Sequence, residues 1–233
     1  MIVYGRNPVR EAIRGPRAVR QVWATKNAAR EPWLHGEAVP VSVASAEEIE
    51  TRAASDAHQG VCAEVEPFRY ATGERLLDTE KPLIVALDQV QDPQNLGAIC
   101  RTADCAGATG LVIPERRAAV VSAAVCKASA GAVEHLPVAR VRNLADFLNE
   151  AKAASAWVYG AQASAPSGYE DADYSGPLVL VLGSEGRGLR PRVAASCDLL
   201  VSIPIKGAVQ SLNVSAAAAV LLYQAARSRR AAT

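Results

Sequence analysis

The sequence has no long apolar run, no closely spaced cysteine pair and only three histidines, and each absence excludes a class of protein. No stretch approaches the roughly 18 apolar residues that a membrane-spanning helix requires. The first residues carry arginines where a secretory signal has an apolar core. The five cysteines are scattered in largely apolar surroundings, which is typical of reduced, buried thiols. We therefore expect a cytoplasmic protein without a membrane anchor, a disulfide framework or a metal site.

The net charge of +1 gives little sign of an anionic partner, but the charges are unevenly distributed along the chain. Residues 1–30 hold seven basic residues against one acid, whereas residues 31–80 hold three basic residues against eleven acids. A local basic face near the N-terminus could therefore contact phosphates while the rest of the surface keeps the chain balanced. A solvated surface without a ligand would give the same pattern, so charge alone does not decide between the two.

The basic residues of the first segment fall on a predicted short helix. Asn7 would be its N-cap, with a proline as the first helical residue, and Gly15 would lie just past its end. Arg6, Arg10 and Arg14 are spaced at four residues, so they would converge on one exposed side. These three arginines are the candidates for phosphate contacts.

The pattern of apolar residues predicts two domains joined by a linker. In residues 1–66, the strand-like segments VRQVWAT, VPVSVAS and VCAEVE and the helical stretch AEEIETRAAS indicate a small α/β unit. Residues 67–82 contain two prolines, a glycine and charged residues among few apolar ones, which is typical of a linker. Residues 83–233 alternate apolar strands such as LIVALD and LVLVL with helical stretches, which predicts a parallel sheet with helices on both faces.

Polar residues and glycines follow three of the predicted strands, in the segments DQVQDPQNLGAICR, GSEGRG and PIKGAVQSLNVS. Ligands of open α/β sheets bind outside the carboxyl ends of the strands, so these segments are the candidate site. The fingerprints G-x-G-x-x-G and G-x-x-x-x-G-K-[ST] are absent. Each segment alone has a structural explanation, with Asn95, Ser211 and Asn213 as helix caps and Arg101 on the surface. Their occurrence in order at strand ends of one domain favours a functional site.

The three segments resemble the motifs of a known enzyme family, the SpoU (TrmH-type) branch of the SPOUT RNA 2′-O-ribose methyltransferases. The first motif stands as DPQNLGAICRTADCAGATGLVIP, the second as LVLGSEGRGL and the third as SIPIKGAVQSLNVSAAAAVLL, so that the resemblance covers Leu83–Arg227. The N-terminal segments YGRNPVREAIRG and HQGV are similar to the members that modify a guanosine in the peptidyl-transferase loop of 23S rRNA. Those members carry an L30e-like RNA-binding domain, which we expect in residues 1–66.

The resemblance implies a fold and a cofactor site. The family fold is a parallel α/β domain with a C-terminal trefoil knot, a rare exception to the ordinary rules of chain connection. S-adenosylmethionine (AdoMet) binds in the knot of the family, held mostly by backbone groups. Carried over to this chain, the cofactor-binding residues are Gly183, Ile203 and Leu212, with Ser184, Pro204 and Ser211 near them.

The resemblance also implies catalytic residues. Arg101 would lie at the reacting ribose, and Asn95, Glu185, Ser211 and Asn213 would complete the site. A guanidinium stays protonated, so we expect Arg101 to hold the adjoining phosphate and stabilise the developing alkoxide, and not to act as a general base. We favour an organising role for Glu185 over proton acceptance, because buried carboxylates usually need a cationic partner.

The expected partners are RNA and a second copy of the chain. Family members are dimers, and we expect the final helix, SLNVSAAAAVLLYQAAR, to contribute to the dimer interface. Arg6, Arg10 and Arg14 would then bind the RNA through its phosphates and shape. The most favoured substrate is a 23S rRNA guanosine.

Three other readings stay open at this point. The same chemistry could act on tRNA or on a ribosomal adenosine. A catalytically silent RNA-binding module of the same fold would keep the motifs without turnover, although the intact Asn95, Arg101 and Glu185 argue against it. A different α/β enzyme, such as a hydrolase or a small-molecule methyltransferase, is disfavoured. No G-x-S-x-G segment occurs and no histidine follows the strand ends discussed above, which argues against a triad hydrolase. The basic N-terminal domain favours a large anionic substrate over a small one.

Overall fold

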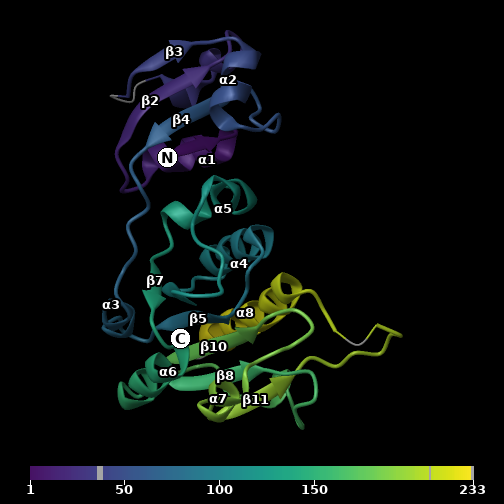
Figure 1. Cartoon of the computed structure of the whole chain (residues 1–233). Coiled ribbons are helices and arrows are strands. Elements are labelled where there is room, and N and C mark those ends of the chain that lie inside the picture. Colours follow the sequence, from purple (N-terminus) through teal and green to yellow (C-terminus); the bar gives the residue numbers. More distant parts are fainter. Residues whose placement is uncertain (36–38, 210, 232–233) are drawn as a thin grey trace.

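The computed structural model describes residues 1–35, 39–209 and 211–231, which form two β-sheets with their helices (Figure 1). The first sheet has four strands in the order β1-β4-β2-β3. Strands β1 and β2 run antiparallel to β4, and β3 runs parallel to β2. The elements of this region are β1 (Ile2–Tyr4), α1 (Arg6–Arg14), β2 (Val19–Ala24), 3-10 turns at Ala28–Arg30 and Pro32–Leu34, β3 (Val41–Val43), α2 (Ala46–Ala53) and β4 (Val61–Val65).

Helix α1 begins earlier than the sequence pattern predicts. The assignment of Asn7 as N-cap is wrong, because the helix starts at Arg6 and its N-cap is Gly5. Gly5 has φ +96°, a backbone conformation that favours glycine, and its N–H donates to the carbonyl of Val61 at 3.0 Å. The turn out of β1 is therefore fixed by the sheet and not by a side-chain cap. The helix ends before Gly15, as predicted.

The second sheet has seven strands in the order β7-β6-β5-β10-β8-β11-β9, and every neighbouring pair is parallel. Its strands are β5 (Leu83–Asp88), β6 (Gly110–Pro114), β7 (Val138–Val141), β8 (Trp157–Ala161), β9 (Ser167–Gly168), β10 (Leu178–Gly183) and β11 (Leu199–Ser202). Its helices are α4 (Pro93–Cys105), α5 (Ala123–Ala128), α6 (Leu144–Ala153), α7 (Pro191–Ala195) and α8 (Val214–Ala231), with 3-10 turns at Ala132–Glu134 and Tyr169–Asp171. The predicted α/β fold with a parallel sheet is confirmed, and the trefoil knot stays a prediction.

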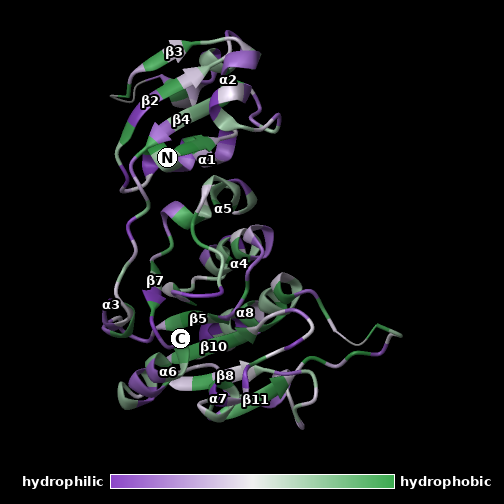
Figure 2. Ribbon diagram, in the orientation of Figure 1, coloured by the Kyte–Doolittle hydropathy of each residue, from purple (hydrophilic) through white to green (hydrophobic). Residues whose placement is uncertain are grey.

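The central strands are apolar on both faces because helices cover both. Leu83, Val85 and Leu87 of β5 belong to the buried cluster that includes residues of α4 and α8. The alternating residues Ile84 and Ala86 belong to a second cluster with residues of α6 and α7. Figure 2 shows β5 and β10 as hydrophobic ribbons in the middle of this region. Continuous apolar strands are the expected sequence pattern for a sheet buried in this way.

Residues 67–82, predicted as a linker, pack along the second sheet. They contain a short helix, α3 (Gly73–Leu77), whose Leu76 is buried. Ala71 forms an isolated parallel bridge with Ala139 of β7. The segment is therefore anchored to the seven-stranded sheet over part of its length.

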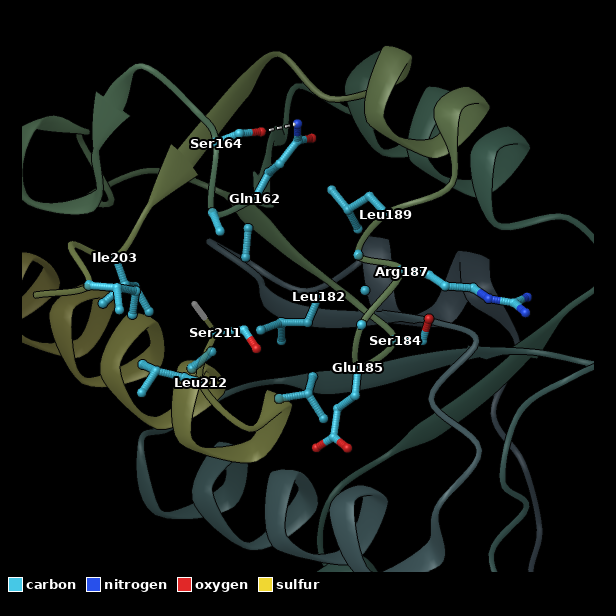
Figure 3. Close-up of a pocket in the computed structure, with 18 of the residues that line it drawn as sticks. Gln162, Ser164, Leu182, Ser184, Glu185, Arg187, Leu189, Ile203, Ser211 and Leu212 are labelled. Carbon is cyan, nitrogen blue, oxygen red and sulfur yellow. Dashed lines mark hydrogen bonds between the residues drawn. The ribbon is translucent and has the colours of Figure 1, made fainter. Parts of the chain in front are cut away.

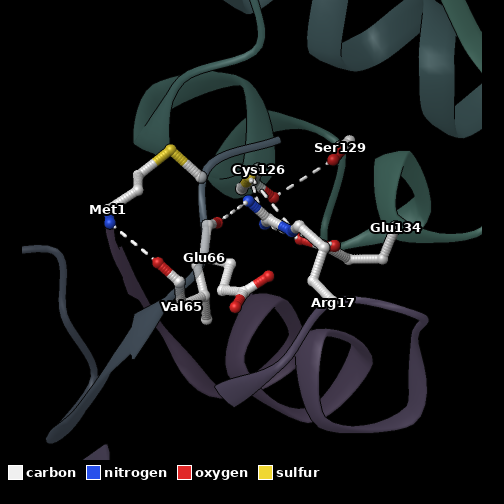
Figure 4. A network of polar contacts seen from close by, with 7 residues as sticks. All are labelled: Met1, Arg17, Val65, Glu66, Cys126, Ser129 and Glu134. Atoms are coloured by element: carbon white, nitrogen blue, oxygen red, sulfur yellow. Dashed lines mark hydrogen bonds and ion pairs between the residues drawn. The ribbon is translucent and has the colours of Figure 1, made fainter. Parts of the chain in front are cut away.

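A buried ion pair joins the two sheet regions (Figure 4). Arg17 follows α1, and its Nε donates to Glu134 at 2.7 Å while a second guanidinium nitrogen contacts the other carboxylate oxygen. The remaining guanidinium nitrogen donates to the carbonyl of Glu66 at 3.1 Å, and the group lies 5.5 Å from the ring centroid of Phe68. Both side chains are almost fully excluded from solvent. A buried charge pair needs such complete pairing, since an unpaired charge there would be strongly destabilising.

Candidate active site

The C-terminal ends of β5 and β10 lie side by side in the middle of the sheet, with Gly183 in register with Asp88. The helices that follow these strands cover opposite faces, since α4 packs with α8 on one face and α7 packs with α6 on the other. Such a divergence of connections opens a crevice at the strand ends, which is the usual ligand position in open α/β sheets.

A pocket of about 500 Å³ lies at the C-terminal ends of the strands (Figure 3). It is enclosed by the segments that follow β8, β10 and β11 and by the start of α8. Its volume is within the range of about 300–1,000 Å³ that is common for ligand pockets. The residues predicted to bind cofactor that line it are Gly183, Ser184, Ile203, Ser211 and Leu212. Pro204, predicted to be near the cofactor, is exposed and does not line the pocket.

The segment after β10 is a tight loop that only glycine permits. A Cβ atom on Gly183 would lie 2.1 Å from the carbonyl carbon of Gly188, so the chain could not fold back with a larger residue. The N–H of Gly188 donates to the carbonyl of Ser184 at 2.9 Å. Gly186 has φ +77° and Gly188 has φ +64°, the left-handed region that favours glycine. The loop presents backbone groups to the pocket and carries Glu185 near its tip.

Side chains from all three predicted motifs meet beside the pocket. The amide nitrogen of Asn95 donates to Glu185 Oε1 at 3.2 Å, and the amide nitrogen of Asn213 donates to Asn95 Oδ1 at 2.9 Å. Asn213 also donates to Glu185 Oε1. Asn213 Oδ1 accepts from the N–H of Ser215 at 2.8 Å, so Asn213 caps α8 as well. We call Asn95, Glu185 and Asn213 the polar cluster.

The structure rules out the cap alternative for Asn95 and gives Glu185 surroundings other than those expected. Asp92, and not Asn95, caps α4, because Asp92 Oδ1 accepts from the N–H of Gln94 at 2.9 Å. Glu185 is exposed, and its partners are two amides, so the expectation of a buried carboxylate beside a cation does not hold. The amides come from the other two motifs, which means that Glu185 ties the three motif segments together.

Asp88 fixes the end of the loop that joins β10 to α7, and the sequence patterns did not predict this contact. It is the last residue of β5 and is fully buried. Its carboxylate accepts from the backbone N–H of Arg190 at 2.8 Å and from the Nε of Arg190 at 2.7 Å. Because Arg190 is the N-cap of α7, this pair fixes the point at which the loop enters the helix.

Arg101 lies apart from the polar cluster. It is exposed on α4 and does not line the pocket, and its side chain makes no hydrogen bond or ion pair with any residue that the structure describes. The structure therefore brings Asn95, Glu185 and Asn213 together and leaves Arg101 outside the pocket of its own chain.

The arginines of α1 are engaged by acids. Arg6 pairs with Glu31 at 3.1 Å, while Arg10 and Arg14 both pair with Glu11, at 2.9 Å and 3.5 Å. All three remain at least partly exposed. An RNA phosphate could reach them, but it would compete with these carboxylates.

The sequence patterns missed one wall of the pocket. This wall is formed by Ala161, the last residue of β8, and by Gln162, Ala163 and Ser164, which follow it. Gln162 donates to Ser164 Oγ at 2.9 Å. The segment contains neither glycine nor charge, so its only signal was its place directly after a strand.

Other kinds of site find no support among the described residues. Burial raises the pKa of Cys100, Cys126 and Cys197 to about 12, so these thiols are protonated at neutral pH and are poor nucleophiles. No group of three or more His, Cys, Asp or Glu side chains within the described ranges could hold a metal ion. None of the helices in those ranges is long and apolar enough to cross a membrane.

The chain is similar to RNA methyltransferases over nearly its whole length. Residues 82–223 match the SpoU rRNA Methylase family, and residues 2–71 match the RNA 2′-O ribose methyltransferase substrate binding family. The chain is 39% identical over 238 residues to a Bacillus subtilis protein whose name assigns it to the TrmH family of tRNA/rRNA methyltransferases, covering 97% of this chain and 95% of the relative. It is 38% identical over 242 residues to the 23S rRNA (guanosine-2′-O-)-methyltransferase RlmB of Pseudomonas putida, covering 98% of this chain and 96% of the relative.

A solved structure supports the same assignment and the cofactor. The SpoU methyltransferase AviRb from Streptomyces viridochromogenes in complex with AdoMet superposes with a TM-score of 0.83 at 28% identity, covering 99% of this chain and 90% of that chain. The glycine loop and the apolar walls of the pocket suit an adenosine held by backbone groups. The chain therefore belongs to the SpoU family of AdoMet-dependent RNA 2′-O-methyltransferases.

Proposed function

We propose that this enzyme methylates the ribose 2′-hydroxyl of a guanosine in 23S rRNA. The similarity to RlmB of Pseudomonas putida extends over nearly the whole chain and so includes residues 2–71, which match a substrate-binding family. The observation that carries the catalytic part of the proposal is the polar cluster, in which Asn95, Glu185 and Asn213 hydrogen-bond to one another beside the pocket. The reaction would take place in the cytoplasm, in keeping with five cysteines that are all free.

The pocket residues would hold AdoMet. Gly183 and Ser184 would contribute backbone groups of the glycine loop, while Ile203 and Leu212 would pack on the adenine. Ser211 lines the same pocket, and Pro204 follows Ile203 in the chain. AdoMet, when bound, supplies a methyl group that its positively charged sulfur has already activated. The protein must then align the hydroxyl and help it to lose its proton.

The polar cluster would align the reacting groups. Glu185 accepts hydrogen bonds from both amides, so its carboxylate keeps the three motif segments in a fixed relation. We assign Glu185 this organising role, with Ser211 and Asn213 at the adjoining wall of the site. Preorganised groups of this kind lower the barrier because they need not rearrange during the reaction.

Arg101 would act on the RNA. It is exposed and has no partner among the described residues, so its guanidinium is available to hold the phosphate beside the reacting ribose and to stabilise the developing alkoxide. Because Arg101 does not line the pocket of its own chain, we propose that the enzyme works as a homodimer that brings this arginine to a neighbouring site. The exposed apolar residues of the segment before α8 and of α8 itself, Ile205, Val209, Leu212 and Tyr223, suit such an interface.

Arg6, Arg10 and Arg14 would add phosphate contacts from the first sheet region. Recognition of folded RNA depends largely on backbone contacts and shape, which arginines on one helix can provide. Their carboxylate partners, Glu11 and Glu31, would have to release them on binding.

Methyl transfer from labelled AdoMet tests the proposed substrate. Unmodified 23S rRNA and bulk tRNA are each incubated with the wild-type enzyme and with Arg101→Ala, and the modified nucleotide is mapped. We expect label on the ribose of a 23S guanosine, with loss of label in the variant. Label in tRNA alone, or on a ribosomal adenosine, would contradict the proposed substrate. AdoMet binding without label in either RNA would indicate a silent RNA-binding module.

A further inference from the structure

Three of the arginines of the seven-stranded sheet region that lack a carboxylate partner lie together at the C-terminal ends of neighbouring strands. Arg116 and Arg117 follow β6 after the intervening Glu115, and Arg142 directly follows β7. All three are exposed, and none makes a hydrogen bond or an ion pair with a residue that the structure describes. By contrast, the exposed Arg192 of the same region is paired with Asp146 at 2.8 Å.

These three arginines lie at the C-terminal end of the sheet, where the polar cluster also lies. Because all seven strands are parallel, the residues after β6 and β7 lie at the edge that also carries Glu185 after β10. Strand β6 is the second neighbour of β10 and β7 is the third, which corresponds to about 10 Å and about 14 Å along the edge. In the opposite direction, the ends of β8 and β11 are occupied by the pocket. An RNA segment that enters the site therefore has its open path over β5, β6 and β7.

The loop that carries Arg116 and Arg117 is held in place by the neighbouring strands. The N–H of Glu115 donates to the carbonyl of Val141, and the N–H of Ala119 donates to the carbonyl of Val90, each at 2.9 Å. Arg117 has φ +58°, a left-handed conformation that several turn residues of this chain share. The two guanidinium groups are thus mounted on a fixed turn.

Acidic side chains border this surface. Arg116 and Arg142 line a concavity of about 770 Å³ that also contains Glu74, Glu115, Asp146 and Glu150. Asp146 is already paired with Arg192. The remaining carboxylates come from the loop after β6 and from α3 and α6, and they would repel a phosphate that moved deeper into the concavity. The cationic groups therefore favour a path along the strand ends.

We propose that Arg116, Arg117 and Arg142 form a phosphate track that holds the RNA segment adjoining the reacting nucleotide. The track rests on the proposed function, since it assumes that the ribose is presented at the polar cluster. It acts on binding and register of the RNA and makes no contact with the pocket for AdoMet.

The test compares two variants with the same change of charge. One is Arg116→Gln/Arg117→Gln/Arg142→Gln, and the control is Arg69→Gln/Lys152→Gln/Arg192→Gln, in which every residue replaced has a carboxylate partner. The dissociation constant for an unmodified 23S rRNA transcript that contains the peptidyl-transferase loop is measured at several salt concentrations, and AdoMet affinity is measured by calorimetry.

We expect the track variant to bind the transcript about tenfold or more weakly, and the slope of log K against log salt to fall by about 2, which corresponds to three lost phosphate contacts on single-stranded RNA. The control variant and the AdoMet affinity of both variants should match the wild type. If the track variant and the control had the same RNA affinity and the same salt dependence, the proposed phosphate track would be refuted. If the wild-type enzyme binds but does not methylate the transcript, and the track variant still loses affinity, the proposed substrate fails while the track stands. Absence of transcript binding by the wild-type enzyme would overturn both.

Discussion

In the four-stranded region, Arg6, Arg10 and Arg14 each lie 3.5 Å or less from a carboxylate oxygen, whereas Arg101 and Arg142 in the seven-stranded region pair with no residue that the structure describes. The first arrangement offsets part of the positive charge within the protein, because two carboxylates serve three arginines. The second leaves it available to an anion. We therefore expect arginines that lack an internal partner to contribute more to RNA binding than paired ones do. Paired arginines should affect stability when replaced, and unpaired ones should affect RNA binding and turnover.

The largest expected effect comes from the most completely paired arginine. Arg17→Met should lower the free energy of unfolding by about 3–5 kcal/mol, because it leaves the buried Glu134 without its partner. Chemical denaturation measures the loss. The double variant Arg17→Met/Glu134→Leu should recover part of it, since no uncompensated charge remains. A single variant as stable as the wild type would show that this ion pair does not stabilise the folded protein.

Arg101, whose side chain has no partner in the described part of the chain, should affect catalysis and not stability. Arg101→Ala should lower single-turnover methyl transfer by about 100- to 1,000-fold, because a cationic donor to the developing alkoxide is lost. The free energy of unfolding and the affinity for AdoMet should stay at the wild-type values, since Arg101 has no partner among the described residues and does not line the pocket. Arg101→Lys should remain well below the wild type if bidentate geometry matters. Near-full activity of the lysine variant would mean that positive charge suffices.

The arginines of α1 should have a smaller effect on RNA affinity than those of the phosphate track. In Arg6→Gln/Arg10→Gln/Arg14→Gln, we expect RNA affinity to fall only a few-fold, because binding already has to displace Glu11 and Glu31. The same salt titration gives the measurement. If this variant lost more affinity than the track variant, the distinction between paired and unpaired arginines would be refuted.

The smallest effect concerns pH and Glu11. Burial by itself would raise the pKa of Glu11, but hydrogen bonds from Arg10 and His135 outweigh it, and the pKa lies below the ordinary value of 4.5. The sign follows: the stabilisation is present above pH 4.5 and is lost as the pH falls through the lower pKa of the folded protein. Urea unfolding across this window should show a loss below about 1 kcal/mol. Glu11→Gln should remove this pH dependence, and an unchanged profile in that variant would assign it to other groups.

Much of the fold was predictable, because apolar periodicity reports burial directly. The apolar run LIVALD predicted a buried strand, which is β5, and the alternation of strands and helices predicted the parallel sheet. Strand β9 has only the two residues Ser167 and Gly168 and pairs with β11 alone, so it leaves no pattern in the sequence. Helix α3 was missed for a similar reason, since five residues with one buried leucine give no periodicity.

The site was predictable as a set of segments but not as a set of contacts. Glycines and polar residues after three strands indicated where the chain would present them. The meeting of Asn95 with Asn213, 118 residues apart, depends on the strand order, which no local pattern contains. The pairing of Asp88 with Arg190 and the exposure of Glu185 depend on it in the same way. The ion pairs could not be predicted either, because the sequence gives the number of charged residues but not which of them are in contact.

The central claim is that residues of the three motif segments act as one catalytic site. A double-mutant cycle on Asn95→Ala and Glu185→Ala tests it, with single-turnover methyl transfer to 23S rRNA as the readout and AdoMet affinity as the control. Groups that act as a unit give non-additive losses, so we predict that the double variant is about as slow as the slower single variant. If the loss in the double variant equalled the product of the two single losses, Asn95 and Glu185 would act independently and the polar cluster would not be a single site.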